Sequence, residues 1–119
     1  MNLLEHLQIK TLELSPEKVV LSLDIHAIHL QPYGYLHGGI NGVLIETACS
    51  LGANQHLEQP HFAVGVDLQV NHLNKAQTGT LTVIAVPDKV GRSLQVWHAD
   101  IFLNQQTKIA VGRCTLAVK

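Results

Sequence analysis

The amino-acid sequence predicts an α+β fold in which a curled antiparallel sheet is wrapped around one long central helix. The segment 40–57 contains no proline and is apolar on most of its faces, which is typical of a helix buried inside a protein. Four segments with strand character follow this helix, and one or two precede it. This order favours a single sheet folded over the helix. A chain of 119 residues has room for one core, so residues 1–119 are expected to form one domain.

The segments on either side of the helix differ in length. Residues 3–7 can form a short helical turn, and residues 9–14 are extended. Between Val19 and Ile25 every second residue is apolar, a period of two that indicates a strand. After the helix the strand character returns in longer segments. The strands predicted there are 62–73, 79–86, 93–103 and 108–118, with turns at 75–78, 87–92 and 104–107.

Few residues of this chain are obliged to face water. Charged side chains make up 14% of the residues, against about 25% in an average soluble domain, and this deficit indicates contacts between subunits. The formal net charge is −1 and the basic residues are scattered singly, so no partner surface of nucleic acid or anionic membrane is expected. Cys49 and Cys114 are too few for a disulfide framework, which favours a reducing cytoplasm. The N-terminus has no basic stretch, and no apolar run reaches about 18 residues, so neither export nor a membrane span is expected.

Glu46 is the first candidate functional residue, because it is the only acidic residue between Asp24 and Glu58. It lies in the middle of the predicted helix among apolar neighbours. Burying a carboxylate without partners is costly or raises its pKa, so this residue must be paired, exposed in a cleft or used in a reaction. One interpretation is a structural glutamate bonded to a nearby Thr or Asn, and the other is a general base or nucleophile.

The run His37-Gly38-Gly39 at the predicted start of the helix is the second candidate. Ser, Thr, Asp and Asn, the usual N-caps, are absent there. Two glycines leave the first-turn N–H groups bare and allow another molecule to approach, while the helix dipole adds partial positive charge. These properties suit an oxyanion hole, and a tight turn that needs flexible residues is the alternative.

Three further observations concern side chains near these two features. Gln31 precedes the histidine run and carries an amide that can hold a carbonyl oxygen or a water. Ser50 follows Glu46 by four residues, so it lies on the same helix face and can orient the carboxylate or a water, unless it merely fills the helix. Cys49 is interpreted as a buried, inert thiol. The eight histidines show no HxH, HExxH or Cys/His ligand spacing, so no metal site is expected.

The residues from Gln31 to Gly39 (QPYGYLHGG), followed seven residues later by Glu46, resemble the signature of hotdog-fold acyl-CoA thioesterases. The similarity is to the branch that includes the 4-hydroxybenzoyl-CoA thioesterase of the Arthrobacter type, the 1,4-dihydroxy-2-naphthoyl-CoA thioesterases and the enterobactin proofreading thioesterase. It covers most of the chain from about Asp24 to the end. The other segments that resemble this branch are Val64-Gly65-Val66-Asp67, Asn71-His72, Gly91-Arg92-Ser93, Val96-Trp97 and Arg113-Cys114-Thr115-Leu116-Ala117.

The resemblance implies a hotdog fold and the hydrolysis of a thioester to a free acid and CoA, without a metal or an organic cofactor. Glu46 would attack the thioester carbonyl or activate the water that does so, and the Gly38 N–H would hold the oxyanion. Gln31 and His37 would position the thioester and the water, and Ser50 would support the reacting group. An aromatic acyl group is implied in preference to a long aliphatic one.

The same resemblance implies a binding site for the nucleotide and phosphates of CoA, with solvated turns as the alternative. Relatives often have Arg and Ser where this chain has Asn74 and Lys75, and lysine lacks the bidentate fork of arginine. A hotdog module that binds an acyl-CoA or acyl-carrier thioester without turning it over is the rival function. Glu46 disfavours it, because a binder has no need of a buried carboxylate, and the Asp/His pair wanted by a hydratase is absent. The residues implied in CoA binding are Asn71, His72, Asn74, Lys75, Arg92 and Ser93.

The spacing of Gly38 and Glu46 predicts that each active site is shared between subunits. They are eight residues apart, which is about 12 Å along a helix, whereas a reacting carboxylate must come within about 3 to 3.5 Å of a carbonyl. A glutamate cannot close that gap within its own helix. A two-fold dimer with antiparallel central helices would supply the missing group twice. We therefore expect a homodimer with shared sites. Assembly of two such dimers into a dimer of dimers, a homotetramer, is a separate expectation.

Overall fold

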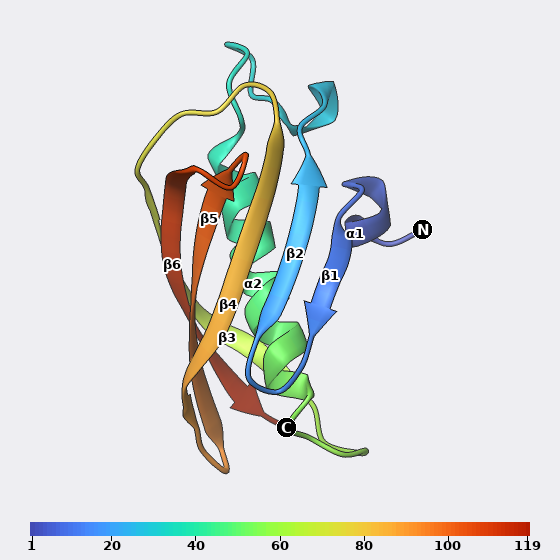
Figure 1. Ribbon diagram of the computed structural model, residues 1–119. Coiled ribbons are helices and arrows are strands. Elements are labelled where there is room, and N and C mark those ends of the chain that lie inside the picture. The colour runs from blue at the N-terminus through green and yellow to red at the C-terminus, as the bar shows by residue number, and fades with distance from the viewer.

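Figure 1 shows the computed structural model, which describes residues 1–119 as a six-stranded antiparallel sheet curled around one long helix. The strand order across the sheet is β1-β2-β4-β5-β6-β3. This arrangement confirms the predicted α+β class. None of the helices is both long and apolar enough to cross a membrane. In chain order the elements are α1 (Leu3–His6), β1 (Lys10–Leu14), β2 (Val19–Asp24), the 3-10 helix η1 (Ala27–His29), α2 (Gly38–Asn54), β3 (Ala63–His72), β4 (Thr80–Val90), β5 (Leu94–Leu103) and β6 (Thr107–Val118).

β3 lies at one edge of the sheet, although it is the first strand after α2. It pairs only with β6, the last strand of the chain. The chain then crosses to β4, which pairs with β2, and continues through two hairpins into β5 and β6. As a result α2 lies against the concave face of the sheet and contacts β3 along one side (Figure 1).

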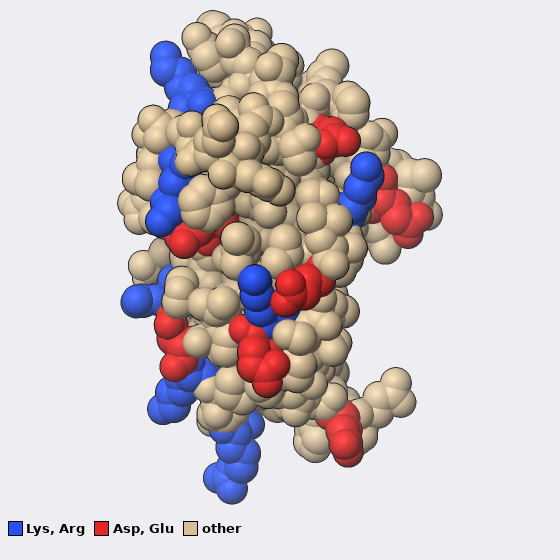
Figure 2. All heavy atoms as spheres, viewed as in Figure 1, with Lys and Arg blue, Asp and Glu red and all other residues tan.

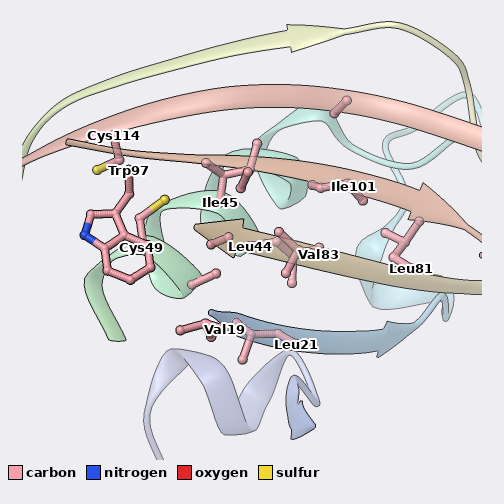
Figure 3. Close-up of a cluster of buried hydrophobic side chains, with 14 of the residues drawn as sticks. Val19, Leu21, Leu44, Ile45, Cys49, Leu81, Val83, Trp97, Ile101 and Cys114 are labelled. Carbon is pink, nitrogen blue, oxygen red and sulfur yellow. The ribbon is translucent and has the colours of Figure 1, made fainter. Parts of the chain in front are cut away.

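The core lies between α2 and the inner face of the sheet (Figure 3). Inward-facing strand residues such as Leu21 and Val83 are completely buried, as the period of two predicts. They pack in one cluster with Leu44 of the helix. Trp97 is the largest completely buried side chain, and its ring lies so close to Gly52 that a Cβ there would collide with it. The Trp97 ring of β5 therefore packs directly against the backbone of the helix near its C-terminal end.

Hydrogen bonds from two side chains fix this end of α2. Gln95, which is completely buried, donates through Nε2 to the Ala53 carbonyl (3.1 Å) and accepts from Trp97 Nε1 (2.9 Å). Asn54 accepts from the Ala63 N–H (2.9 Å) and donates to the Ala63 carbonyl (3.2 Å). The last turn of the helix is thereby tied to β5 and to the start of β3, which sets where the preceding helix turns meet β3.

Charged side chains are sparse on the surface. Figure 2 shows Lys and Arg side chains mixed with Asp and Glu, with wide uncharged areas between them. The Lys–carboxylate ion pairs are exposed, for example Lys108 with Asp100 at 3.6 Å, so each contributes little to stability. On this face most basic side chains lie toward the left margin and the lower end, with Asp and Glu side chains between them.

Two predicted elements differ from the structure by more than one residue at an end. β4 continues through Pro87 to Val90, where the sequence predicts a turn. Because β2 pairs with β4 only as far as Ala85, and a bulge follows Pro87, the missing N–H of the proline is not needed by a neighbouring strand. The helix begins and ends slightly earlier than the predicted 40–57. Both glycines after His37 consequently lie inside its first turn.

Candidate active site

Glu46 lies on the half-buried face of α2. The helix is thus buried along one side, and not on most faces as its composition predicts. A hollow of about 410 Å³ opens beside the carboxylate, and we call it the Glu46 hollow. Glu46 forms no ion pair and accepts no hydrogen bond within the chain, so the interpretation as a glutamate bonded to Thr or Asn is wrong. Besides Glu46, the lining residues include Leu4, Thr47, Ser50, Leu51, Val64 and Gly65.

β3 meets Glu46 at a β-bulge. The register between β3 and β6 shifts between Gly65 and Asp67, which makes Val66 the extra residue. At Gly65 the strand comes so close to the helix that a Cβ would collide with Oε2 of Glu46 and lie 3.4 Å from Sγ of Cys114. Glycine is therefore required at this position for the carboxylate to keep its place.

His37 is the N-cap of α2, which corrects the prediction that the first-turn N–H groups are all bare. Its Nδ1 accepts a hydrogen bond of 2.8 Å from the Gly39 N–H, and its carbonyl accepts one of 3.0 Å from Ile40. Histidine here does what Ser or Asp does at most helix starts. The Gly38 N–H has no acceptor within the chain, so it is the donor that the helix start offers to a ligand.

A second hollow, of about 460 Å³, lies at the start of α2, and we call it the helix-start hollow. Gly38 and Gln31 line it, together with Asn41 from the helix and residues 72–76 from the end of β3 onward. The ring of His72 lies against Gly38, with Cε1 and Nε2 3.0 and 3.1 Å from where a Cβ on that glycine would stand. Residues far apart in sequence thus surround the bare Gly38 N–H.

Gln31 is oriented by its own loop. Its Oε1 accepts hydrogen bonds from the N–H groups of Tyr33 (2.6 Å) and Tyr35 (3.3 Å). Its Nε2 has no partner within the chain, and the residue lines the helix-start hollow. Nε2 is a donor. The predicted ability to hold a carbonyl oxygen or a water therefore rests on this nitrogen.

Three of the residues implied in CoA binding lie at the helix-start hollow. His72, Asn74 and Lys75 line it, and Nζ of Lys75 lies 4.9 Å from the centre of the Tyr35 ring. Asn74 also has a structural role, because its Nδ2 donates to the Lys108 carbonyl (2.9 Å) and holds the segment against β6. Lys75 is the side chain of this group that brings positive charge.

The other three lie elsewhere. Asn71 lines a separate hollow between β3, β5 and β6. Arg92 and Ser93 lie in the turn between β4 and β5, at the end of the molecule opposite to the start of α2 (Figure 1). A single chain does not bring all six residues to one place.

The Glu46 hollow and the helix-start hollow share no lining residue. They open at different points of one continuous helix, where eight residues correspond to about 12 Å. Each chain therefore presents a free carboxylate at one place and a free first-turn N–H at another.

Comparison with known proteins identifies the family. The model of the thioesterase superfamily matches residues 33–110, a stretch that contains Gly38 and Glu46. The chain belongs to the thioesterase superfamily. This thioesterase is 36% identical over 119 residues to the 1,4-dihydroxy-2-naphthoyl-CoA hydrolase of Listeria monocytogenes. The aligned region covers 100% of the chain and 97% of that protein. It is 40% identical over 117 residues to the ComA2 protein of Bacillus subtilis, covering 98% of the chain and 93% of that protein.

Solved structures agree with this assignment. The thioesterase from Haemophilus influenzae superposes with a TM-score of 0.92 at 34% identity, covering 98% of this chain and 81% of the other. A Staphylococcus aureus protein, solved as a glutamate-to-alanine variant, gives a TM-score of 0.96 at 34% identity over 99% and 98% of the two chains. The predicted hotdog fold is confirmed, and the protein is a thioester hydrolase.

The two cysteines of this thioesterase, Cys49 and Cys114, are buried in the core near Glu46. Burial raises the pKa of Cys49, and burial together with the charge of Glu46 raises the pKa of Cys114 to about 11. Both thiols are neutral at ordinary pH, and a neutral thiol is a poor nucleophile. This agrees with the interpretation of Cys49 as inert. No three His, Cys, Asp or Glu side chains come together as metal ligands.

Sequence reasoning missed two residues of this thioesterase that the structure places at the hollows. Asn41 is only 3% exposed and lies in the first turn of the helix. An amide in an otherwise apolar helix was the feature of the sequence that could have indicated it. Gly65 lies within a segment that resembles the family, but nothing in its sequence context indicates that it touches Glu46. That contact depends on a strand register.

Proposed function

We propose that this thioesterase hydrolyses acyl-CoA thioesters in a site shared by two copies of the chain, residues 1–119 acting as one hotdog domain. Glu46 of one copy acts on a carbonyl held by the Gly38 N–H of the other. The observation that carries this proposal is that the free carboxylate and the free N–H line different hollows of the same helix. They are too far apart to meet one carbonyl within a chain.

The Gly38 N–H and the helix dipole stabilise the negative charge that develops on the carbonyl oxygen. Glu46 either attacks the carbonyl carbon, giving an anhydride that water then opens, or takes a proton from the water that attacks. In both routes the C–S bond breaks, CoA leaves as a thiolate that takes up a proton, and the acid is released. No metal or organic cofactor enters either route.

Three neighbouring side chains serve this chemistry. Gln31 donates from its free Nε2 to the thioester or to the water. His37 fixes the turn that presents the Gly38 N–H, because its Nδ1 is occupied by the cap hydrogen bond. Ser50 lies one helical turn from Glu46 in the same hollow and orients the carboxylate or the water.

The exposed edge of β3 supports a second copy of the chain as the partner. β3 pairs with β6 on one side only, and Val66 and Leu68 on it are 57% and 36% exposed. An unpaired strand edge with apolar side chains is suited to pairing with a copy of itself about a two-fold axis. Such pairing sets two α2 helices antiparallel, and two of these dimers would form the tetramer.

CoA recognition is proposed to draw on the same assembly. Lys75 at the helix-start hollow and Arg92 at the opposite end supply positive charge, with His72, Asn74, Asn71 and Ser93 as the remaining contacts. An aromatic acyl group is proposed because a relative spanning the whole chain is a 1,4-dihydroxy-2-naphthoyl-CoA hydrolase. The apolar side chains of Leu4, Leu51 and Val64 in the Glu46 hollow are compatible with a ring.

The first test replaces Glu46 by glutamine, which keeps the shape and removes the basic, nucleophilic oxygen. Turnover of the best thioester should fall by about 10² to 10⁴ while substrate binding is largely retained. Thiol release from aryl and aliphatic CoA thioesters is the assay, and it also ranks the acyl groups. A near wild-type rate for Glu46→Gln contradicts the catalytic assignment, and a preference for long aliphatic chains contradicts the aromatic one.

The second test addresses the shared site. Gly38→Pro deletes the N–H, and the backbone of His37 (φ −65°, ψ 129°) suits a residue before proline at the first position of a helix. Gly38→Ala is the matched control, because it keeps the N–H and adds the same Cβ beside His72.

Glu46→Ala and Gly38→Pro should each be inactive alone and active after subunit exchange. Random pairing makes half the dimers mixed, each with one intact site, so recovery should approach about a quarter of wild-type activity. Native mass spectrometry monitors the mixed dimers. If they form and stay inactive, the sites are not shared.

A further inference from the structure

The ring of His72 is held at the start of α2 by a buried amide. Nδ2 of Asn41 lies 3.1 Å from Nδ1 of His72, and the two residues are 31 positions apart in sequence. Asn41 itself is only 3% exposed. Burying an amide is costly unless its groups are bonded, and Oδ1 of Asn41 is buried without any partner. The side chain of Asn41 is thus buried at a cost in free energy, and its one side-chain hydrogen bond is with His72.

This contact assigns the proton of the imidazole. With the amide oriented so that Nδ2 faces the ring, Nδ2 donates and Nδ1 of His72 accepts, and the neutral ring then carries its hydrogen on Nε2. Nε2 has no hydrogen-bond partner within the chain, and it lies 3.1 Å from where a Cβ on Gly38 would stand. A free N–H donor of a side chain thus lies beside Gly38, whose own N–H is also free, and both residues line the helix-start hollow.

We propose that His72 donates through Nε2–H to the same carbonyl oxygen as the Gly38 N–H, and that Asn41 is the positioning residue that fixes its ring and tautomer. This rests on the proposed function, in which Gly38 binds that oxygen. Two donors that are already oriented stabilise the developing charge without reorganisation during the reaction. In the alternative role, His72 contacts the CoA nucleotide. It would then contribute to binding of a part of the substrate that does not react.

The two roles are separated by pairing each acyl-CoA with the thioester of the same acid and pantetheine, which lacks the nucleotide. Loss of an oxyanion donor lowers kcat by about 10² to 10³ and does so equally for both substrates. Loss of a nucleotide contact raises KM for the CoA thioester alone. His72→Ala should therefore reduce kcat by the same factor on both thioesters.

His72→Gln and His6→Ala serve as matched variants. The glutamine amide nitrogen reaches about as far as Nε2 of histidine. The kcat of His72→Gln should therefore be about tenfold or more above that of His72→Ala. His6 is exposed in the last turn of α1, away from the helix-start hollow, and its removal should leave kcat unchanged. Urea unfolding shows that each variant is folded at the assay temperature.

The positioning role of Asn41 is tested by a measurement that would not change if Asn41 only stabilised the fold. Selective ¹⁵N labelling of histidine reports the tautomer of each ring by NMR, and His72→Gln identifies the His72 signals. The wild type should show the proton on Nε2, and Asn41→Ala should show a mixture of tautomers with a lower kcat on both thioesters. Asn41→Asp accepts from Nδ1–H, so it should move the proton of the neutral ring from Nε2 to Nδ1.

The outcomes are distinct from failure of the proposed function. If wild type does not cleave either thioester, or Glu46→Gln cleaves both normally, the proposed function is wrong. If Glu46→Gln is inactive but His72→Ala keeps kcat, or changes KM for the CoA thioester only, the inference about His72 is overturned. A wild-type neutral ring with its proton on Nδ1 overturns both roles, because Nε2 would then be an acceptor and could not donate to the carbonyl oxygen.

Discussion

Replacing Gly65 by alanine should lower turnover by about a hundredfold and leave the fold intact. Gly65 is not among the residues with positive φ, so alanine adds no backbone strain. Its Cβ would nevertheless collide with Oε2 of Glu46 and stand 3.2 Å from the carboxyl carbon, where ordinary contact begins at 3.4 Å. The substitution therefore acts on the position of the carboxylate and not on the stability of β3.

The magnitude follows from the distance that the carboxylate must withdraw. Relief of the collision needs a displacement on the order of 1 Å, and a misplacement of that size in a reacting group costs about 10²-fold in rate. This corresponds to about 2.7 kcal/mol of activation free energy. The free energy of unfolding should change by less than about 1 kcal/mol, because alanine is tolerated in a strand.

The assay compares kcat for Gly65→Ala in two backgrounds, wild type and Glu46→Ala, with urea unfolding of all four proteins. If alanine acts through the carboxylate, it should change the residual rate of Glu46→Ala by less than about twofold, because the group it displaces is already gone. The reasoning is refuted if Gly65→Ala keeps near wild-type kcat, or if it loses the same factor in both backgrounds.

Three more results are expected. Gly52→Ala should destabilise the protein by about 1–3 kcal/mol in urea unfolding, because its Cβ would overlap the buried Trp97 ring; unchanged stability would contradict the packing at that point. Lys75→Ala should raise KM for an acyl-CoA several-fold more than for the pantetheine thioester, and the difference should shrink as salt is added; equal effects would place the phosphates elsewhere. Because burial raises the pKa of Cys114 to about 11, its contribution to stability is complete below the pKa of the unfolded thiol and is lost as the pH rises toward 11. Unfolding free energies measured from pH 7.5 to 10.5 should therefore fall, with a smaller slope in Cys114→Ala, and equal slopes would show that this thiol is not responsible.

The helix and the strands could be predicted because their signals are local. Alternation from Val19 to Ile25 and the apolar segment 40–57 depend on neighbours within a few residues, and both elements form as expected. Pro87 misled the prediction, since proline ordinarily ends a strand. Only the pairing of β4 with one neighbour beyond Ala85 shows why it is tolerated.

The candidate site could be predicted only in part. Glu46 and Gly38 stand out through residue type and spacing within one helix. The approach of Gly65 to the carboxylate requires the bulge between β3 and β6, and the contact between Asn41 and His72 joins residues 31 positions apart. Such contacts arise from register and chain crossing, which no local pattern encodes. His37 as a cap was hidden for a different reason, since histidine is an uncommon residue in that role.

The loop that orients Gln31 has a consequence for how such a protein can change in evolution. Both hydrogen bonds that this side chain accepts within the chain end on Oε1, from the N–H groups of Tyr33 and Tyr35. A carboxylate oxygen would accept from the same two groups at least as well. Folding therefore exerts no selection for the amide nitrogen, which is maintained only by what the hollow has to bind. A single base change in a glutamine codon gives glutamate, so a lineage can lose this donor in one step and keep a fully folded descendant.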